Sequence, residues 1–171
     1  MNDYVIVTAL EQEFPFKDEF NVLYTGVGKV NAAISLMTFL YKNLNIKKVI
    51  NVGTAGGISI NKHCIYECGV YIQGDIMYPS YEPETLTFDS SKHTLSTFDS
   101  FQKSLPTRKC DLVDMEGFVF AKICKLNKIN FSCIKYVCDI VGDENQEADW
   151  MRHYRDGRYL LKESICKIIY E

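Results

Sequence analysis

The sequence lacks the features that mark nucleic-acid-binding, membrane and secreted proteins. Basic residues are not in excess, because 19 Lys and Arg stand against 22 Asp and Glu, giving a net charge of −3. Such a charge provides no electrostatic footprint for nucleic acid. No apolar run approaches the roughly 18 to 20 residues of a membrane helix. The start, MNDYVIVTALEQEF, has no basic n-region and no cleavage-like site. We therefore expect no nucleic acid, no membrane and no signal peptide.

The cysteines form no pattern of paired or metal-binding residues. There are seven, an odd number, spread through apolar segments, which is typical of reduced thiols in a cytosolic protein. His63, Cys64 and Cys68 are candidate metal ligands, but no second cluster of matching spacing accompanies them. Small core side chains are the favoured interpretation. We expect no metal, no cofactor and a cytoplasmic location.

The sequence does contain alternating strand-like and helix-like segments. Its 171 residues, 47% of them hydrophobic, suffice for one domain with a core, and we expect a single domain over 1–171. Hydrophobic periodicity predicts helices over about 30–44, 114–128 and 149–170, and strands at 4–9, 21–26, 47–53, 69–78, 84–89, 94–99 and 131–139. This order predicts an α/β fold with a central mixed, largely parallel twisted sheet flanked by helices, in which the strands at 69–78 and 84–89 are antiparallel to each other.

Polar residues follow several of the predicted strands. Glu13 comes after the first strand, Thr54 lies in the GTAGG segment after the third, and Asp139 ends the strand at 131–139. Open α/β sheets bind ligands beyond the carboxyl ends of their strands, so these residues predict a polar pocket. Each also has a simpler interpretation: a helix-start acid, a flexible turn, and an Asx turn or helix cap, respectively. Only their combination favours a site.

Glu116 raises a separate question, because it lies on the apolar face of its predicted helix. At 100° per residue, Phe120 and Ile123 share its face and Lys125 lies opposite. Acids are almost never fully buried without a partner. Glu116 therefore either reaches solvent at the helix start or faces a polar cavity. Asp114, just before it, is a candidate N-cap or first-turn acid.

Four segments together resemble a known family. They are YTGVGKVNAAISL at 24–36, NVGTAGGI at 51–58, VDMEGFVFAKIC at 113–124 and VCDIVGDE at 137–144. In this order they resemble the nucleoside phosphorylase/hydrolase superfamily, and most closely its methylthioadenosine/adenosylhomocysteine nucleosidases. These enzymes cleave the N-glycosidic bond between ribose and a purine. The resemblance implies a nucleoside phosphorylase-like three-layer fold, a small-molecule purine nucleoside as substrate, and a homodimer.

The resemblance also implies roles for matching residues. Asp139 matches the aspartate that protonates or hydrogen-bonds N7 of the purine, which requires a raised pKa. Glu116 matches the glutamate that binds the ribose hydroxyls, and Glu13 matches the glutamate that activates water. Phe101 is expected to stack on the base. The implied substrate-binding set consists of Thr54, Ala55, Gly56, Phe101, the backbone of Gln102, and Met115 beside the sugar.

Water is the expected nucleophile. The phosphorylases carry one arginine in the first loop and another just before the glycine motif, where this sequence has ALEQE and Asn51. Phosphate next to Glu11 and Glu13 would be repelled. Arg152, in the basic run MRHYRDGR, is interpreted as solvated.

The middle of the chain departs from the family pattern. It is shorter than typical members at about 60–100, a region that covers the 5′ end of the substrate. Phe98, Phe118 and Cys138 stand where glycine, alanine and serine are usual. These departures leave the 5′ substituent open, with a deoxyfutalosine-type nucleoside as one variant. A phosphate-dependent phosphorylase and a truncated, non-catalytic purine-binding protein are the alternative functions.

Overall fold

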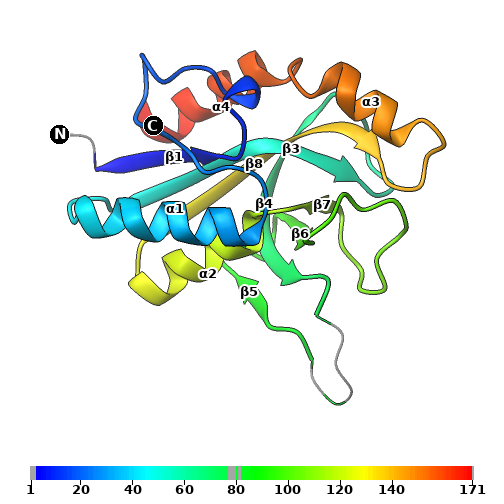
Figure 1. The fold of residues 1–171 in the computed structure, drawn as a ribbon, viewed down its shortest axis with the longest axis horizontal. Helices are drawn as coiled ribbons and strands as arrows, with labels where there is room; N and C mark the ends of the chain where they lie inside the picture. The colour runs from blue at the N-terminus through cyan, green and yellow to red at the C-terminus, as the bar shows by residue number, and fades with distance from the viewer. Residues whose placement is uncertain (1–2, 77–79, 81, 171) are drawn as a thin grey trace.

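The protein folds around one mixed β-sheet with helices packed on both of its faces (Figure 1). The computed structural model describes residues 3–76, 80 and 82–170. The elements, in chain order, are β1 (Tyr4–Thr8), the 3₁₀ helix η1 (Glu11–Glu13), β2 (Val22–Tyr24), α1 (Lys29–Lys42), β3 (Lys48–Gly57), β4 (Ile65–Gln73), β5 (Thr85–Thr87), β6 (His93–Thr97), β7 (Leu112–Asp114), α2 (Gly117–Asn127), β8 (Asn130–Ile140), α3 (Gln146–His153) and α4 (Arg158–Tyr170).

The sheet closes on itself, which the expected open arrangement did not include. The strand order is β2-β1-β3-β7-β6-β4-β5, and β8 pairs with both β3 and β4. Strands β3, β7, β6, β4 and β8 therefore form a closed ring. The first half of β3 pairs with β1 and its last two residues pair with β7. Between Ala55 and Gly56 its register with β8 shifts, and Cys138 is the extra residue on β8. The expectation of a mixed sheet with mostly parallel pairs is confirmed, whereas the open twisted sheet is wrong.

Alternate residues of the central strands pack into separate cores on the two sides of the sheet. Val5 and Val7 of β1 belong to the core that includes buried residues of α1 and α2. Ile6, between them, belongs to the core under α4. That second core contains Leu161 and Ile165, as the spacing of apolar residues in the last helix predicted. Burial of each such side chain contributes about 1.5–3 kcal/mol to stability.

The predicted segments differ from the observed elements mainly at their ends. The GTAGG segment is not a flexible turn, because β3 continues to Gly57 and pairs with β8. The helix expected over 114–128 begins at Gly117, since Asp114 is the last residue of β7. The strand expected at 69–78 is β4, and positions 77–78 lie outside the described residues. The strand expected at 84–89 is β5, which is antiparallel to β4 as predicted.

The single helix expected over 149–170 is two helices, α3 and α4. Gly157 lies between them against the ring of Tyr136, where an added Cβ would be 2.1 Å from the ring. A turn over 154–157 separates the two helices, and glycine at its last position leaves room for the ring. In the described parts of the chain, no helix combines the length and apolar character needed to span a membrane.

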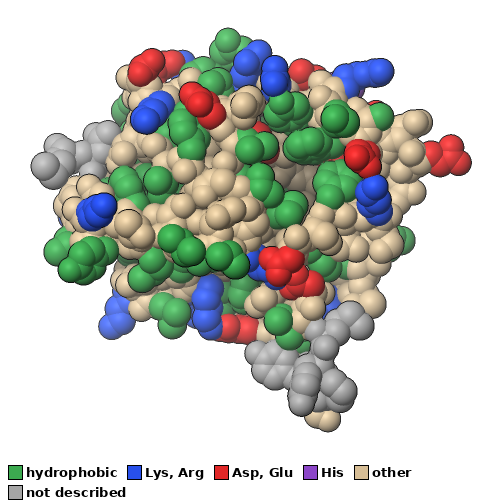
Figure 2. Space-filling model, in the orientation of Figure 1, with side chains coloured by type: hydrophobic (Ala, Val, Ile, Leu, Met, Phe, Trp, Pro, Cys, Tyr) green, Lys and Arg blue, Asp and Glu red, His purple; other side chains and the backbone are tan. Residues whose placement is uncertain are grey.

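Helix α1 turns much of its apolar surface outward. Its buried apolar side chains are Ala32, Leu36 and Leu40. A second row on the helix and just past its end is exposed, by 45% to 89%, and consists of Val30, Ile34, Met37, Tyr41 and Leu44. Figure 2 shows hydrophobic side chains along the face of the molecule that α1 covers in Figure 1. We call this row the α1 stripe.

Candidate active site

A cleft opens beside the ends of β3 and β8 and contains about 680 Å³ of space, part of it open to solvent. Its lining comes from the first loop and η1, β3, the segment 100–102, the start of α2, β8 and α3. All of the residues predicted for the site line it: Glu13, Thr54, Ala55, Gly56, Phe101, Gln102, Met115, Glu116 and Asp139. The structure thus brings together residues that lie far apart in the sequence.

Glu13 points from η1 into the cleft, whereas Glu11 faces solvent. The Glu13 Oε1 atom accepts a hydrogen bond of 2.6 Å from the Thr54 hydroxyl and one of 3.0 Å from the Thr54 backbone N–H. Its Oε2 atom accepts longer bonds of 3.4 Å from the Thr8 hydroxyl and the Leu10 N–H. Donors on both oxygens hold the carboxylate in one orientation at the edge of the cleft.

Asp139 lies near the end of β8 with only 1% of its surface exposed. Its Oδ2 atom accepts a bond of 2.9 Å from the Gln146 side-chain amide, and its Oδ1 atom accepts a bond of 3.4 Å from the Cys138 thiol. Burial raises the pKa of Asp139, against the opposing effect of these two hydrogen bonds. A raised pKa is the direction of shift that a carboxyl group needs if it is to donate a proton to a ligand.

Gln146 and Trp150 of α3 complete the site on the side of Asp139, and the sequence analysis did not identify either. The Gln146 amide also donates to the Gln102 carbonyl at 2.9 Å, so it connects Asp139 to the segment 100–102. The Trp150 indole N–H donates to the Thr54 hydroxyl at 3.3 Å. Its ring meets Phe101 edge to face, with centroids 6.1 Å apart. The pair forms an aromatic wall of the cleft.

Glu116 faces the polar cleft and not solvent, with 7% of its surface exposed. It occupies the N-cap position of α2, but its side chain makes no capping bond. Instead, its Oε1 atom accepts a hydrogen bond of 2.7 Å from the Gly28 N–H, just before α1. Burial and the nearby Asp114 carboxylate raise the pKa of Glu116 to about 7, while Lys135 and the Gly28 N–H lower it.

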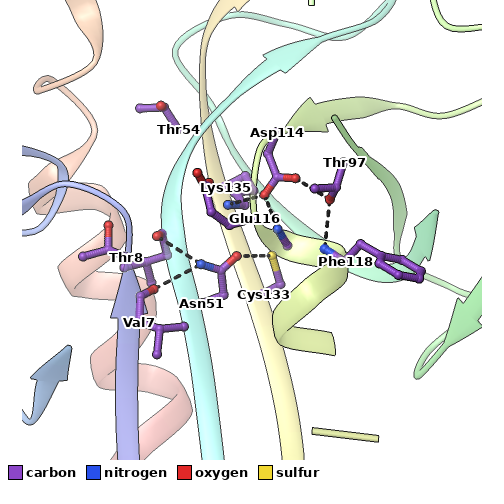
Figure 3. Close-up of polar contacts among 12 residues, drawn as sticks. Val7, Thr8, Asn51, Thr54, Thr97, Asp114, Glu116, Phe118, Cys133 and Lys135 are labelled. Carbon is purple, nitrogen blue, oxygen red and sulfur yellow. Dashed lines mark hydrogen bonds and ion pairs between the residues drawn. The ribbon is translucent and has the colours of Figure 1, made fainter. Parts of the chain in front are cut away.

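Asp114 and Lys135 form a buried ion pair beside Glu116 (Figure 3). The Lys135 ammonium lies 2.9 Å from Asp114 Oδ2, and both side chains are 2% exposed. Burial opposes the charge on Lys135, but the Asp114 carboxylate and its hydrogen bond, together with Cys133 and Glu116, outweigh burial and raise the lysine pKa. The sequence analysis missed Lys135, although a single lysine within the apolar strand FSCIKYVCD was a signal that it needs a buried partner.

Of the three residues that depart from the family pattern, two are core side chains and one is a hydrogen-bond donor to Asp139. Phe98 packs with Cys110, Val113 and Val141 in a small core cluster. Phe118 belongs to the core under α1 and α2. The Cys138 thiol donates a hydrogen bond to Asp139. Arg152 is exposed, as expected.

The cleft therefore combines a buried acid whose pKa is raised with two further acids that are held by hydrogen bonds. A protonated Asp139 can donate to a leaving group, and Glu13 can accept a proton from water. A carboxylate such as Glu116 can accept hydrogen bonds from hydroxyl groups and stabilise positive charge. This combination suits cleavage of a bond between a sugar and a leaving group with a basic nitrogen.

The chain belongs to the phosphorylase superfamily, whose family model matches residues 16–65 and 60–169. A 5′-methylthioadenosine/S-adenosylhomocysteine nucleosidase of Bacillus subtilis (strain 168) is 29% identical over 164 residues, which cover 74% of this chain and 71% of that protein. A crystal structure of a nucleosidase of the same name from Colwellia psychrerythraea 34H, in complex with adenine, has a TM-score of 0.75 and 19% identity and covers 89% of this chain and 88% of that one. A futalosine hydrolase mutant of Helicobacter pylori has a TM-score of 0.77 and 14% identity, covering 91% and 93%.

Proposed function

We propose that this protein is a purine nucleosidase that hydrolyses the N-glycosidic bond of methylthioadenosine, adenosylhomocysteine or a related adenine nucleoside. The observation that carries the proposal is the convergence of Glu13, Glu116 and Asp139 on one cleft. Membership of the phosphorylase superfamily supports it. Two further findings support it: similar proteins are named as nucleosidases, and the crystal structure of one of them is a complex with adenine.

In the proposed reaction, water attacks C1′ of the ribose as the bond from C1′ to the purine nitrogen breaks. Asp139 donates a proton to N7, so that the base leaves as a neutral purine. Glu13, held by Thr54, accepts a proton from the attacking water. Glu116 binds the ribose hydroxyls and stabilises the positive charge that develops on the sugar.

The remaining lining residues are proposed to position the substrate. Phe101 stacks on the base, an interaction supported by the edge-to-face contact that holds its ring against Trp150. The Gln102 backbone contacts the purine edge next to Asp139, and its connection to Gln146 supports that placement. Met115 packs beside the ribose. Ala55 and Gly56 leave room for the ligand over β3.

Hydrolysis is favoured over phosphorolysis by the charges around the cleft. Of the described residues that line it, none is an arginine, and Lys135 is already paired with Asp114. Asn51, where phosphorylases carry arginine, donates its amide to the Val7 carbonyl at 3.1 Å. A phosphate ion would therefore meet the carboxylates of Glu13 and Glu116 without an unpaired cation.

We further propose that the protein is a homodimer that packs through the α1 stripe. The stripe residues follow one another at spacings of four and three, which is the pattern of helices that pack against each other. Val27, just before α1, is 42% exposed and lines the cleft, so the stripe adjoins the site. A two-fold dimer would bury the stripe against its own copy. Sedimentation of Ile34→Asp, expected to be monomeric, tests this proposal.

A cytoplasmic location is proposed from the cysteines. All seven are free. Burial raises the pKa of the Cys110 thiol to about 11 and that of the Cys124 thiol to about 12, which keeps both protonated and unreactive. Unpaired thiols of this kind suit a reducing compartment.

The experiment that tests the proposed function is a base-release assay on methylthioadenosine and adenosylhomocysteine, read by chromatography with and without phosphate. Free adenine and a free 5-substituted ribose, unaffected by phosphate, are the expected products. Strict phosphate dependence would replace the proposal with phosphorolysis. Absence of base release from a wide panel of purine nucleosides, together with calorimetric binding of adenine, would establish a non-catalytic purine-binding protein.

A further inference from the structure

We propose that the Asp114–Lys135 ion pair positions Glu116. The pair leaves the Glu116 side chain free to extend into the cleft, and it determines the charge around that side chain. This inference deepens the proposed function and rests on it where activity is concerned. Neither residue needs to touch the substrate for this role.

Asp114 does the capping that the N-cap residue of a helix normally does. Its Oδ2 atom accepts the Gly117 N–H at 2.8 Å, and its Oδ1 atom accepts the Thr97 hydroxyl at 2.6 Å. That hydroxyl in turn accepts the Phe118 N–H at 2.9 Å. The first two free N–H groups of α2 are thus satisfied without Glu116, although Glu116 occupies the N-cap position. The Glu116 side chain is therefore free to extend into the cleft (Figure 3).

Lys135 fixes Asp114 in this position. Its ammonium reaches Asp114 Oδ2 from β8, so the start of α2 is tied to the strand that also carries Asp139. Lys135 and Asp139 both belong to β8, on the two sides of its register shift against β3. Both line the cleft. The ion pair thus holds the start of α2, and with it Glu116, against the strand that carries Asp139.

The charged groups around Glu116 come from three elements. Asp114 of β7 and Glu13 of η1 oppose its negative charge, and Lys135 of β8 favours it. The Gly28 N–H before α1 adds a neutral donor. Lys135 is the cation among these groups, and it compensates for the carboxylate of Asp114, which is needed for capping. Removing Lys135 should therefore raise the pKa of Glu116, and removing the Asp114 carboxylate should lower it.

Four variants test this opposition through the pH dependence of kcat/KM. Lys135→Met should move the acidic limb, where Glu116 gains its proton, to higher pH by about one unit. Asp114→Asn should move that limb to lower pH. The double variant should return it to the wild-type midpoint or slightly below, because the effect of Asp114 on Glu116 exceeds that of Lys135. Lys135→Arg, which keeps the charge, should restore the wild-type midpoint.

A matched control is the same substitution at an exposed lysine. Lys92, paired with Glu67 at the surface, is 40% exposed in its side chain. Lys92→Met should leave the acidic limb unmoved. If Lys135→Met does not fold because it leaves Asp114 buried and unpaired, two different outcomes still test the inference: a lower midpoint in Asp114→Asn and a return toward the wild-type midpoint in the double variant.

A second readout does not depend on catalysis. The Glu116 carboxyl can be titrated by ¹³C NMR in protein labelled at glutamate, with Glu116→Gln to assign its signal. Its midpoint should rise in Lys135→Met and fall in Asp114→Asn, whether or not the wild type releases any base. A midpoint that stays within experimental error of wild type in folded variants would overturn the inference. Absence of base release by the wild type, with the shifts present, would overturn only the proposed function.

Discussion

The Thr54 hydroxyl donates a hydrogen bond of 2.6 Å to Glu13 Oε1, although the two residues are separated by 41 positions in the chain. The same oxygen accepts the Thr54 backbone N–H, so one residue of β3 orients the carboxylate twice. A carboxylate used as a general base needs this fixed direction, because proton transfer requires a close and aligned partner. The contact is the structural basis of the first prediction.

Glu13→Gln should lower kcat by about 10²–10⁴-fold, because a neutral amide cannot accept a proton from water. The binding of adenine should change little, since Gln can still accept the Thr54 N–H through its carbonyl oxygen. Steady-state kinetics and calorimetry measure the two quantities. Glu11→Gln is the matched control, two residues away and exposed. A similar loss of kcat in both variants would contradict the assignment of Glu13.

Asp139→Asn should abolish base release while the protein remains folded. Asn keeps the shape and the acceptor for Gln146 but cannot deliver a proton to the leaving purine. Chromatographic base release and a thermal unfolding curve are the measurements. Asp143→Asn, at an exposed position near the same strand end, provides the control. Residual turnover near the wild-type rate would remove Asp139 from the mechanism.

Glu116→Gln should weaken a transition-state analogue with a cationic sugar mimic much more than it weakens adenine. The charge on the sugar exists only in the transition state, so the lost carboxylate matters only for ligands that carry that charge. Inhibition constants for the analogue and a dissociation constant for adenine compare the two effects. Equal losses for both ligands would refute the assignment of Glu116 to the ribose.

Glu116 should also make the unliganded protein less stable as the pH rises. Its pKa is about 7 when folded, against an ordinary value of 4.5, so the folded state binds more protons than the unfolded state between these values. Stability from this group is therefore present below pH 4.5 and is lost as the pH rises through about 7. The free energy of unfolding should fall by about 3 kcal/mol across this range relative to Glu116→Gln.

Urea unfolding at several pH values measures that difference. Glu116→Gln should be more stable than wild type at pH values above the range, where the wild type carries a buried charge without substrate. A stability difference that does not vary with pH would show that Glu116 titrates normally. The predicted result would show that the buried Glu116 carboxylate lowers the stability of the fold, as is common for residues of a functional site.

Gly157→Ala should destabilise the protein by about 1–3 kcal/mol, because overpacking forces backbone or side chains to move. The added Cβ would lie 2.1 Å from Tyr136 on β8. Urea unfolding measures the change. Tyr136→Leu/Gly157→Ala should lose less than the sum of the single variants, since the smaller side chain leaves space for the methyl group.

Much of the fold could be predicted from local patterns. The helix of α1, the strands β1, β3 and β8 and the antiparallel pair of β4 and β5 follow from periodicity and from residue preferences, which act over a few positions. The location of α1 was predictable, but not the side that it buries. Both of its faces carry apolar residues, and only packing on the sheet selects Ala32, Leu36 and Leu40 for the core.

The candidate site, like the fold, was predictable from the sequence only in part. The sequence by itself determined which acids stand at strand ends and at the start of α2, because those positions follow from the elements alone. Only the tertiary structure decided that Glu116 faces the cleft, that Asp114 caps α2 in its place, and that Lys135 neutralises Asp114 from β8. These partners meet through strand pairing and closure of the sheet, which bring distant segments together and leave no local pattern in the chain.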